Sequence, residues 1–121
     1  MKKKVMVIGA SENPERYSNK AVRRLLENGY EVIPIGVNKQ GEIEGLKIIV
    51  GQPPFENIDT VTLYVNSGIQ KQYYEYVLGL HPKRIIFNPG AENEEFGKKV
   101  SAKGIEVIEA CTLVMLSTKT F

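Results

Sequence analysis

Short apolar runs recur along the chain, and polar segments that contain glycine separate them. Residues 4–8 form an apolar run that ends at Gly9, a pattern typical of a strand buried on both faces of a parallel sheet. Residues 46–50 are a candidate for a short extra strand. Pro34 has no amide hydrogen, so the second strand should end there or lack a ladder hydrogen bond. Four further runs predict strands at residues 31–35, 60–65, 84–87 and 105–108.

Apolar residues at helical spacing link these runs. The first helix has Ser18 as its candidate N-cap and ends near Gly29. A helix after the strand at 60–65 ends at His81 and has its apolar positions at Ile69, Tyr73, Tyr76, Val77 and Leu80. Another helix begins after Asn93, a candidate cap that two glutamates follow in the favourable first turn. Residues 112–116 start a final short helix.

Strands that alternate with helices predict right-handed βαβ crossovers and a parallel sheet. We therefore expect residues 1–121 to form a single α/β domain, a Rossmann-like three-layer αβα sandwich with a mainly parallel sheet of about five strands. In this fold the ligand lies at the carboxyl ends of the strands, where the strand order reverses beside the first strand. The loops at that edge are polar and contain glycine.

Composition narrows the function classes. The chain has 121 residues, enough for one core without covalent staples but not for a second substrate domain. A net charge of +2 is too balanced for nucleic-acid binding driven by bulk charge. One Cys and one His exclude an internal disulfide framework and a multi-cysteine or histidine-rich metal centre. No apolar run reaches the length of a membrane span or a signal sequence, so we expect a cytoplasmic protein.

The loop after the first strand has the residues expected of a phosphate-binding turn. Gly9 permits a tight exit from the strand, and the small Ala10 and Ser11 let a pyrophosphate approach the backbone amides. Arg16 can hold a phosphate in bidentate fashion, and Ser18 can bind an anion or cap the helix. Only the first glycine of the fingerprint G-x-G-x-x-G is present. A plain turn with a solvated Arg16 is the alternative.

The segment after the second strand argues against NAD as the ligand. An NAD-binding domain usually places an acidic residue there to hold the ribose hydroxyls. This chain has Asn38 and Lys39 instead, and no acid between residues 36 and 40. A base at this point permits a ligand with an extra phosphate, such as NADP or coenzyme A. The alternative is that Lys39 is a solvated loop residue without a role in binding.

The order and spacing of several motifs resemble those of a known family over nearly the whole chain. The motifs are Gly9-Ala10-Ser11, Pro14, Arg16-Tyr17-Ser18, Gly29-Tyr30, Val32-Ile33-Pro34, the run from Asn88 to Glu95, and Cys111. Together they resemble the small stand-alone CoA-binding proteins, which are similar to the CoA-binding domain of the succinyl-CoA synthetase alpha subunit. In many relatives an asparagine and a base follow the second-strand proline sooner than Asn38 and Lys39 do here.

The resemblance implies a Rossmann-like fold with coenzyme A across the point where the strand order reverses. Ser11 and Arg16 would hold its phosphates with help from Ser18. Val65 would lie along the ligand, and Asn88 and Gly90 would face its pantetheine arm.

Neither reactive side chain indicates catalysis. His81 precedes Pro82 at a helix end and is interpreted as a turn residue. Cys111 is interpreted as a packed thiol, and its alternative role is a mixed disulfide with coenzyme A. The sequence therefore predicts a protein that binds coenzyme A or its thioesters without intrinsic catalysis. A CoA-presenting subunit of an acyl-CoA ligase complex and an NADP-binding or other nucleotide-binding regulatory module are the alternatives. The sequence leaves two kinds of partner open, further copies of the same chain in a homo-oligomer and a subunit of a ligase.

Overall fold

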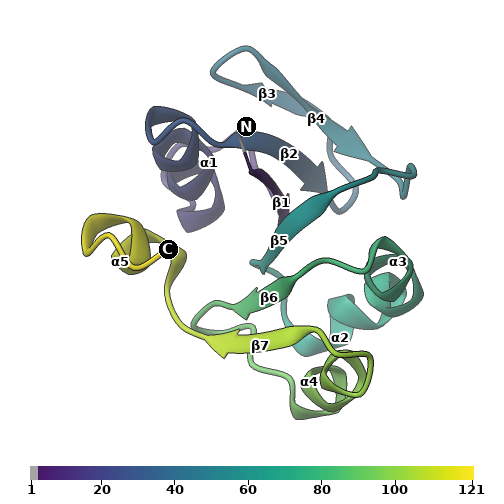
Figure 1. Cartoon of the computed structure of the whole chain (residues 1–121). Helices are drawn as coiled ribbons and strands as arrows, with labels where there is room; N and C mark the ends of the chain where they lie inside the picture. The colour runs from purple at the N-terminus through teal and green to yellow at the C-terminus, as the bar shows by residue number, and fades with distance from the viewer. Residues whose placement is uncertain (1–2) are drawn as a thin grey trace.

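The computed structural model describes residues 3–121, which form one seven-stranded sheet with helices on both faces (Figure 1). The strands are β1 (Lys4–Ile8), β2 (Glu31–Gly36), β3 (Gly41–Ile43), β4 (Leu46–Val50), β5 (Ile58–Leu63), β6 (Arg84–Phe87) and β7 (Glu106–Glu109). Their order is β3-β4-β2-β1-β5-β6-β7. Neighbouring strands are parallel except β3 and β4. The predicted α/β fold with a mainly parallel sheet is confirmed.

Two helical layers cover the sheet. The helices are α1 (Tyr17–Glu27), α2 (Ser67–Gln70), the 3-10 turn η1 (Lys71–Tyr73), α3 (Tyr74–Leu80), α4 (Glu94–Ser101) and α5 (Thr112–Ser117). The helices α1 and α5 lie on one face, and α2, α3 and α4 lie on the other (Figure 1). Because side chains alternate along a strand, Val5 and Val7 of β1 pack toward α1 while Met6 and Ile8 pack toward α3.

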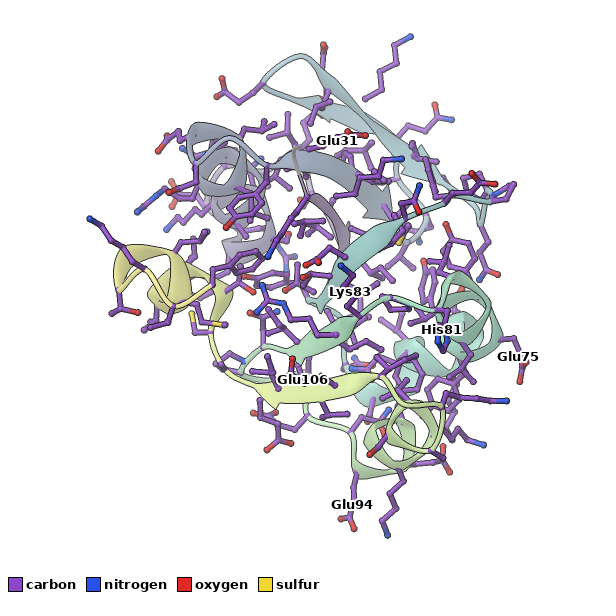
Figure 2. The ribbon with its side chains drawn as sticks, viewed as in Figure 1. Glu31, Glu75, His81, Lys83, Glu94 and Glu106 are labelled. Carbon is purple, nitrogen blue, oxygen red and sulfur yellow. The ribbon has the colours of Figure 1, made fainter. Side chains whose placement is uncertain are left out.

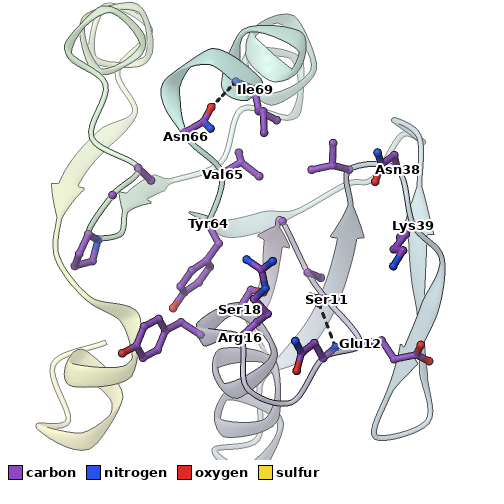
Figure 3. A pocket seen from close by; sticks show the side chains of 18 of the residues that line it. Ser11, Glu12, Arg16, Ser18, Asn38, Lys39, Tyr64, Val65, Asn66 and Ile69 are labelled. Atoms are coloured by element: carbon purple, nitrogen blue, oxygen red, sulfur yellow. Dashed lines mark hydrogen bonds between the residues drawn. The ribbon is translucent and has the colours of Figure 1, made fainter.

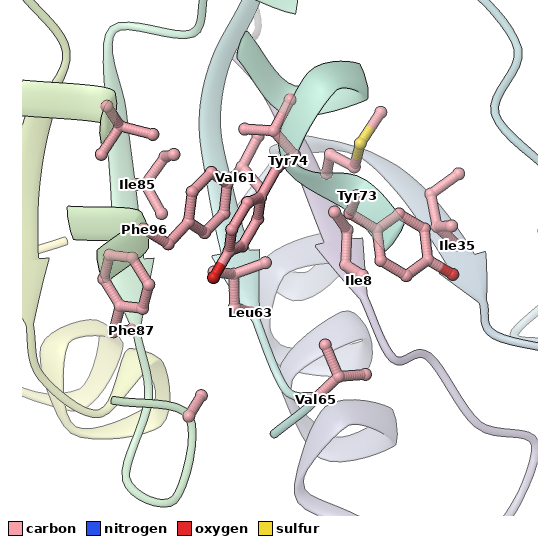
Figure 4. Close-up of a cluster of buried hydrophobic side chains, with 14 of the residues drawn as sticks. Ile8, Ile35, Val61, Leu63, Val65, Tyr73, Tyr74, Ile85, Phe87 and Phe96 are labelled. Atoms are coloured by element: carbon pink, nitrogen blue, oxygen red, sulfur yellow. The ribbon is translucent and has the colours of Figure 1, made fainter. Parts of the chain in front are cut away.

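The core beneath α3 and α4 is built around aromatic rings (Figure 4). Tyr74 stacks on Phe96 with their ring centroids 4.3 Å apart, and Phe96 meets Phe87 edge-on at 5.9 Å. Tyr73 is buried among the same residues, and Tyr76 packs against them while partly exposed. The tyrosines that follow β5 therefore belong to the core, as their helical spacing indicated.

The sheet has more strands than the sequence predicts because a hairpin extends its β2 edge. The candidate strand at 46–50 is β4, and β3 pairs with it across a turn in which Glu44 and Gly45 have φ of 49° and 83°. Such left-handed pairs are typical of tight hairpins. The pattern gave no signal for β3, since Ile43 is its one buried residue. β4 pairs with β2 only at residues 35 and 36, beyond the proline that lacks an amide hydrogen.

The helix boundaries correct two predictions. Helix α1 begins at Tyr17 with Arg16 in the N-cap position, so the prediction of Ser18 as the cap was wrong; Ser18 is buried in the first turn. The segment predicted as one helix over residues 69–80 is divided into α2, η1 and α3. The predicted cap of α4 is confirmed, because the Asn93 side chain accepts a hydrogen bond from the Phe96 amide at 3.1 Å.

His81 lies far from the ligand edge of the sheet. It ends α3 in a left-handed conformation with φ of 48°, in the turn that leads to β6 (Figure 2). The neighbouring Lys83 forms a surface ion pair with Asp59, with 4.0 Å between Nζ and Oδ1. This turn precedes β6, so it stands at the edge where the parallel strands begin. The interpretation of His81 as a turn residue is confirmed.

Candidate ligand-binding site

A cleft of about 840 Å³ lies at the carboxyl edge of the sheet. Its walls are the loops that follow β1, β2, β5 and β6 (Figure 3). The chain passes from β1 to β2 on one side and returns to β5 on the other, so β1 is the point where the strand order reverses. This is where open α/β sheets bind ligands, and the volume lies within the usual range for small-molecule sites.

The structure brings together nearly all of the residues predicted for the site. Those that line the cleft are Gly9, Ala10, Ser11, Arg16, Ser18, Asn38, Lys39, Val65 and Gly90. In Figure 3, Arg16 and Ser18 lie at the lower centre of the view, Asn38 and Lys39 at the right, and Val65 and Ile69 in the upper part. Asn88 is the predicted residue that does not line the cleft.

Asn88 is committed to holding the scaffold. Its side chain is buried, and its amide donates hydrogen bonds to Thr62 Oγ1 at 2.6 Å and to the Leu63 carbonyl at 2.9 Å. Its carbonyl oxygen accepts from the Thr112 amide at 2.9 Å. These bonds tie the end of β6 to β5 and to the start of α5. The side chain therefore joins three elements, and the prediction that Asn88 faces the ligand is corrected.

The turn after β1 requires glycine at its first position. Gly9 has φ of 98°, and a Cβ there would lie 2.9 Å from Val65 Cγ1 and 3.0 Å from the Tyr64 carbonyl oxygen. The amides of Gly9 and Ala10 both donate to the Ile35 carbonyl, at 2.8 and 2.9 Å. They fasten the turn to β2, so these two amides are already hydrogen-bonded within the fold. Ser11, Glu12 and Asn13 continue the lining of the cleft along this loop.

The N-terminus of α1 opens into the cleft without a cap. Within residues 3–121, no side chain caps α1, and its first turn contains no acidic residue. Tyr17 and Ser18 of that turn line the cleft beside Arg16. The first amides of a helix have no intrahelical acceptor and carry the positive end of the helix dipole. A free helix N-terminus next to a guanidinium has the donors and the positive charge that suit an anion such as phosphate.

The opposite wall is the turn between β2 and β3. Gly36 is required there, because a Cβ would lie 2.6 Å from the Lys39 carbonyl oxygen. Asn38 and Lys39 are exposed on this turn. Glu12, which the sequence analysis did not single out, reaches across from the β1–α1 loop and accepts a hydrogen bond from the Glu42 amide at 3.2 Å. This contact joins the two walls at the mouth of the cleft.

The remaining wall is apolar and was only partly predicted. Val65, Ile69 and Ala91 line it from the loops after β5 and β6. Ile69 was interpreted as a core residue from its helical spacing, and Ala91 carries no chemical signal of its own. Tyr64 also lines the cleft, although its hydroxyl is buried and has no hydrogen-bond partner among the residues described. Burial raises the pKa of Tyr64 well above its usual value.

Cys111 does not line the cleft. The thiol is half-buried at the N-cap of α5, which agrees with its interpretation as a packed residue. None of the helices among residues 3–121 has the length and apolar character needed to cross a bilayer.

Comparison with known proteins decides the family. Residues 3–117 match the family described as a CoA binding domain. The chain belongs to this family. An uncharacterized protein of known crystal structure is 49% identical, with a TM-score of 0.96, and the match covers 100% of this chain and 99% of that one. A hypothetical protein from Pyrococcus horikoshii is 28% identical with a TM-score of 0.85, covering 97% of this chain and 83% of that chain.

The same fold occurs inside a larger enzyme. An acetyl-coenzyme A synthetase of Ca. Korarchaeum cryptofilum, solved with phosphate and ADP, matches 89% of this chain with a TM-score of 0.71 and 21% identity. The matched part is 25% of that enzyme's chain. At this identity the likeness concerns the fold, and it supports the predicted Rossmann-like architecture of this CoA-binding domain.

Proposed function

We propose that the chain binds coenzyme A, free or as a thioester, at the carboxyl edge of its sheet and carries no catalytic activity of its own. The observation that carries the proposal is the uncapped N-terminus of α1, which opens with Arg16 into a cleft of about 840 Å³ in a CoA-binding domain. The ligand supplies the phosphate oxygens that the first amides of α1 lack.

The charged and apolar walls of the cleft fit the two halves of coenzyme A. Ser11, Arg16 and the first turn of α1 bind the diphosphate. The nucleotide extends toward Asn38 and Lys39, where the lysine meets the 3′-phosphate. The pantetheine arm, which is uncharged, lies along the apolar wall of Val65 and its neighbours.

The groups that line the cleft support binding without catalysis. Within residues 3–121 its lining contains neither histidine nor cysteine. Glu12 is the one acidic side chain in that lining, and its carboxylate already accepts a hydrogen bond from the Glu42 amide. This bond holds the Glu12 carboxylate beside β3, and the lining described within residues 3–121 offers no second carboxyl or imidazole group to act with it as an acid–base pair. Hydrolysis of acetyl-CoA by the purified chain, followed with a thiol reagent, would contradict this part of the proposal.

Titration calorimetry with coenzyme A, acetyl-CoA, NADP and NAD tests the proposal directly. We expect both CoA species to bind and NAD to bind at least about tenfold more weakly, since the turn after β2 has no acid for the ribose hydroxyls. Binding of NAD with no binding of either CoA species overturns the proposal. Stronger binding of NADP than of coenzyme A would favour a nucleotide-binding regulatory module instead.

The role of Lys39 is tested by removing either the lysine charge or the 3′-phosphate of the ligand. We expect Lys39→Gln to weaken coenzyme A binding about threefold and to leave dephospho-CoA unchanged, because only the 3′-phosphate contact is lost. Lys47→Gln is the matched control, since Lys47 is an exposed lysine on β4 that does not line the cleft. Equal affinities of the wild-type chain for coenzyme A and dephospho-CoA would remove this role.

A further inference from the structure

Gln70 is a buried polar side chain that lies between two loops of the cleft without lining it. It is fully buried, with 0% of its surface exposed, in the short helix α2. Its amide donates one hydrogen bond to the Val65 carbonyl at 2.8 Å and one to the Ala91 carbonyl at 2.7 Å. These two bonds, which form the Gln70 bridge, use both amide hydrogens of the side chain.

The Gln70 bridge joins the two loops that form the apolar wall of the cleft. The paired register of β5 and β6 ends at Leu63 and Phe87, so the strand ladder does not set the distance between the loops beyond it. Val65 and Ala91 both line the cleft past this point. A side chain that bonds to both carbonyls therefore holds the two loops at a defined separation.

A second set of bonds orients Gln70. Its carbonyl oxygen accepts from Asn93 Nδ2 at 2.9 Å, which determines which end of the amide faces the two loops. The same Asn93 nitrogen donates to the Tyr74 hydroxyl at 2.8 Å, and this hydroxyl lies 3.0 Å from Glu95 Oε1. Because Gln70 is fully buried and both its amide hydrogens and its carbonyl oxygen are hydrogen-bonded, rotating its side chain would leave buried polar atoms unpaired.

We propose that Gln70 is a positioning residue that sets the width of the apolar half of the cleft and thereby the affinity for the pantetheine arm. The inference rests on the proposed binding of coenzyme A. Gln70 lines no part of the cleft itself and acts through Val65 and Ala91. The phosphate half, built by residues 9–18, meets the apolar wall where Gly9 lies against Val65, but among residues 3–121 none of its hydrogen bonds involves Gln70.

The test compares coenzyme A with 3′-phosphoadenosine 5′-diphosphate, which is coenzyme A without its pantetheine arm. Gln70→Met keeps the length of the side chain and removes both donors. We expect it to weaken coenzyme A binding about tenfold and to change binding of the nucleotide fragment by less than about twofold. Gln52→Met is the matched control, because the exposed Gln52 amide also donates to a backbone carbonyl, that of Gln72, away from the cleft.

A second variant keeps the test open if Gln70→Met does not fold. Asn93→Asp retains the oxygen that caps α4 but removes the donors to Gln70 and Tyr74, so Gln70 loses its orientation. We expect about a threefold loss for coenzyme A and none for the fragment. Unchanged coenzyme A binding in both variants, or an equal loss for both ligands, overturns the positioning role.

Failure of the proposed function gives a different result. If the wild-type chain binds the nucleotide fragment but gains nothing from the pantetheine arm, the ligand part of both proposals is wrong. Hydrogen exchange then still tests the bridge: we expect faster exchange at residues 65–70 and 89–92 in the folded variant and unchanged exchange at residues 9–18. Unchanged exchange in both regions would show that Gln70 does not hold these loops.

Discussion

The N-termini of α1 and α4 lie at the same edge of the sheet and are built in opposite ways. Helix α4 is closed: the Asn93 side chain accepts from the Phe96 amide, and Glu94 and Glu95 occupy its first turn. Helix α1 has the basic Arg16 at its N-cap, no acid in its first turn, and, within residues 3–121, no capping side chain. A capped helix end contributes stability, whereas an open one next to a cation is available to an anionic ligand.

The largest effect should come from making α1 resemble α4. Arg16 has φ of −74° and ψ of 140°, the extended conformation of an N-cap residue, so Arg16→Asp can cap the helix. We expect the free energy of unfolding to rise by about 1 kcal/mol and coenzyme A binding to weaken at least about a hundredfold, because a carboxylate replaces a cation where phosphate binds.

Chemical denaturation of the Arg16→Asp variant measures the expected gain in stability, and calorimetry measures the expected loss of coenzyme A binding. Coenzyme A binding that survives the charge reversal would place the phosphates elsewhere. Ser101→Asp is the control, since it adds the same acid to an exposed position at the far end of α4.

The reverse change opens α4. We expect Asn93→Ala to lower the free energy of unfolding by about 1–2 kcal/mol, because the cap and the hydrogen bonds to Gln70 and Tyr74 are lost together. Asn93→Asp, which keeps the cap, should lose less, and the difference measures the capping contribution. Urea denaturation of the two variants provides this comparison, and equal losses would mean that the cap contributes nothing.

Neutralising the open end is a milder change than reversing its charge. We expect Arg16→Gln to weaken coenzyme A binding about tenfold and to reduce the dependence of that binding on salt, since one phosphate contact is lost. Arg24→Gln, on the exposed side of the same helix where Arg24 pairs with Glu27 at 3.7 Å, should leave binding unchanged. Equal effects of the two substitutions would indicate a general charge effect rather than a contact at the N-terminus of α1.

The smallest effect concerns the Tyr64 hydroxyl, which is buried in the part of the chain that the structure describes. We expect Tyr64→Phe to keep coenzyme A binding and to change the free energy of unfolding by less than about 1 kcal/mol at neutral pH, because removing a buried polar group offsets the loss of its weak interaction with the neighbouring Thr112. Weaker binding in this variant would show that the hydroxyl, and not only the helix amides, recognises the ligand.

The pH dependence of stability provides a second measurement on Tyr64. Burial raises its pKa in the folded state, so the unfolded chain loses this proton more readily above pH 10. The folded state is therefore destabilised as pH rises above 10. We expect this alkaline loss to be smaller in Tyr64→Phe than in the wild-type chain, as measured by denaturation at pH 9 and pH 11.

The sequence by itself determined the features that depend on local chemistry. Apolar runs predicted the parallel strands, because a strand buried on both faces tolerates few polar residues. Asn93 followed by two glutamates predicted the start of α4, since a cap and its first turn are contiguous in the chain. Gly9 predicted the tight turn beside the ligand edge, where only a residue without Cβ avoids Val65.

Only the tertiary structure decided which polar groups are used up by the fold. The family resemblance predicted that Asn88 faces the ligand, but its side chain is hydrogen-bonded to Thr62 and Thr112, which are distant in the sequence. Gln70 had no chemical signal in the sequence, yet it joins the loops that hold Val65 and Ala91. Hydrogen bonds between distant segments depend on which segments meet, and a residue pattern along the chain does not contain that geometry.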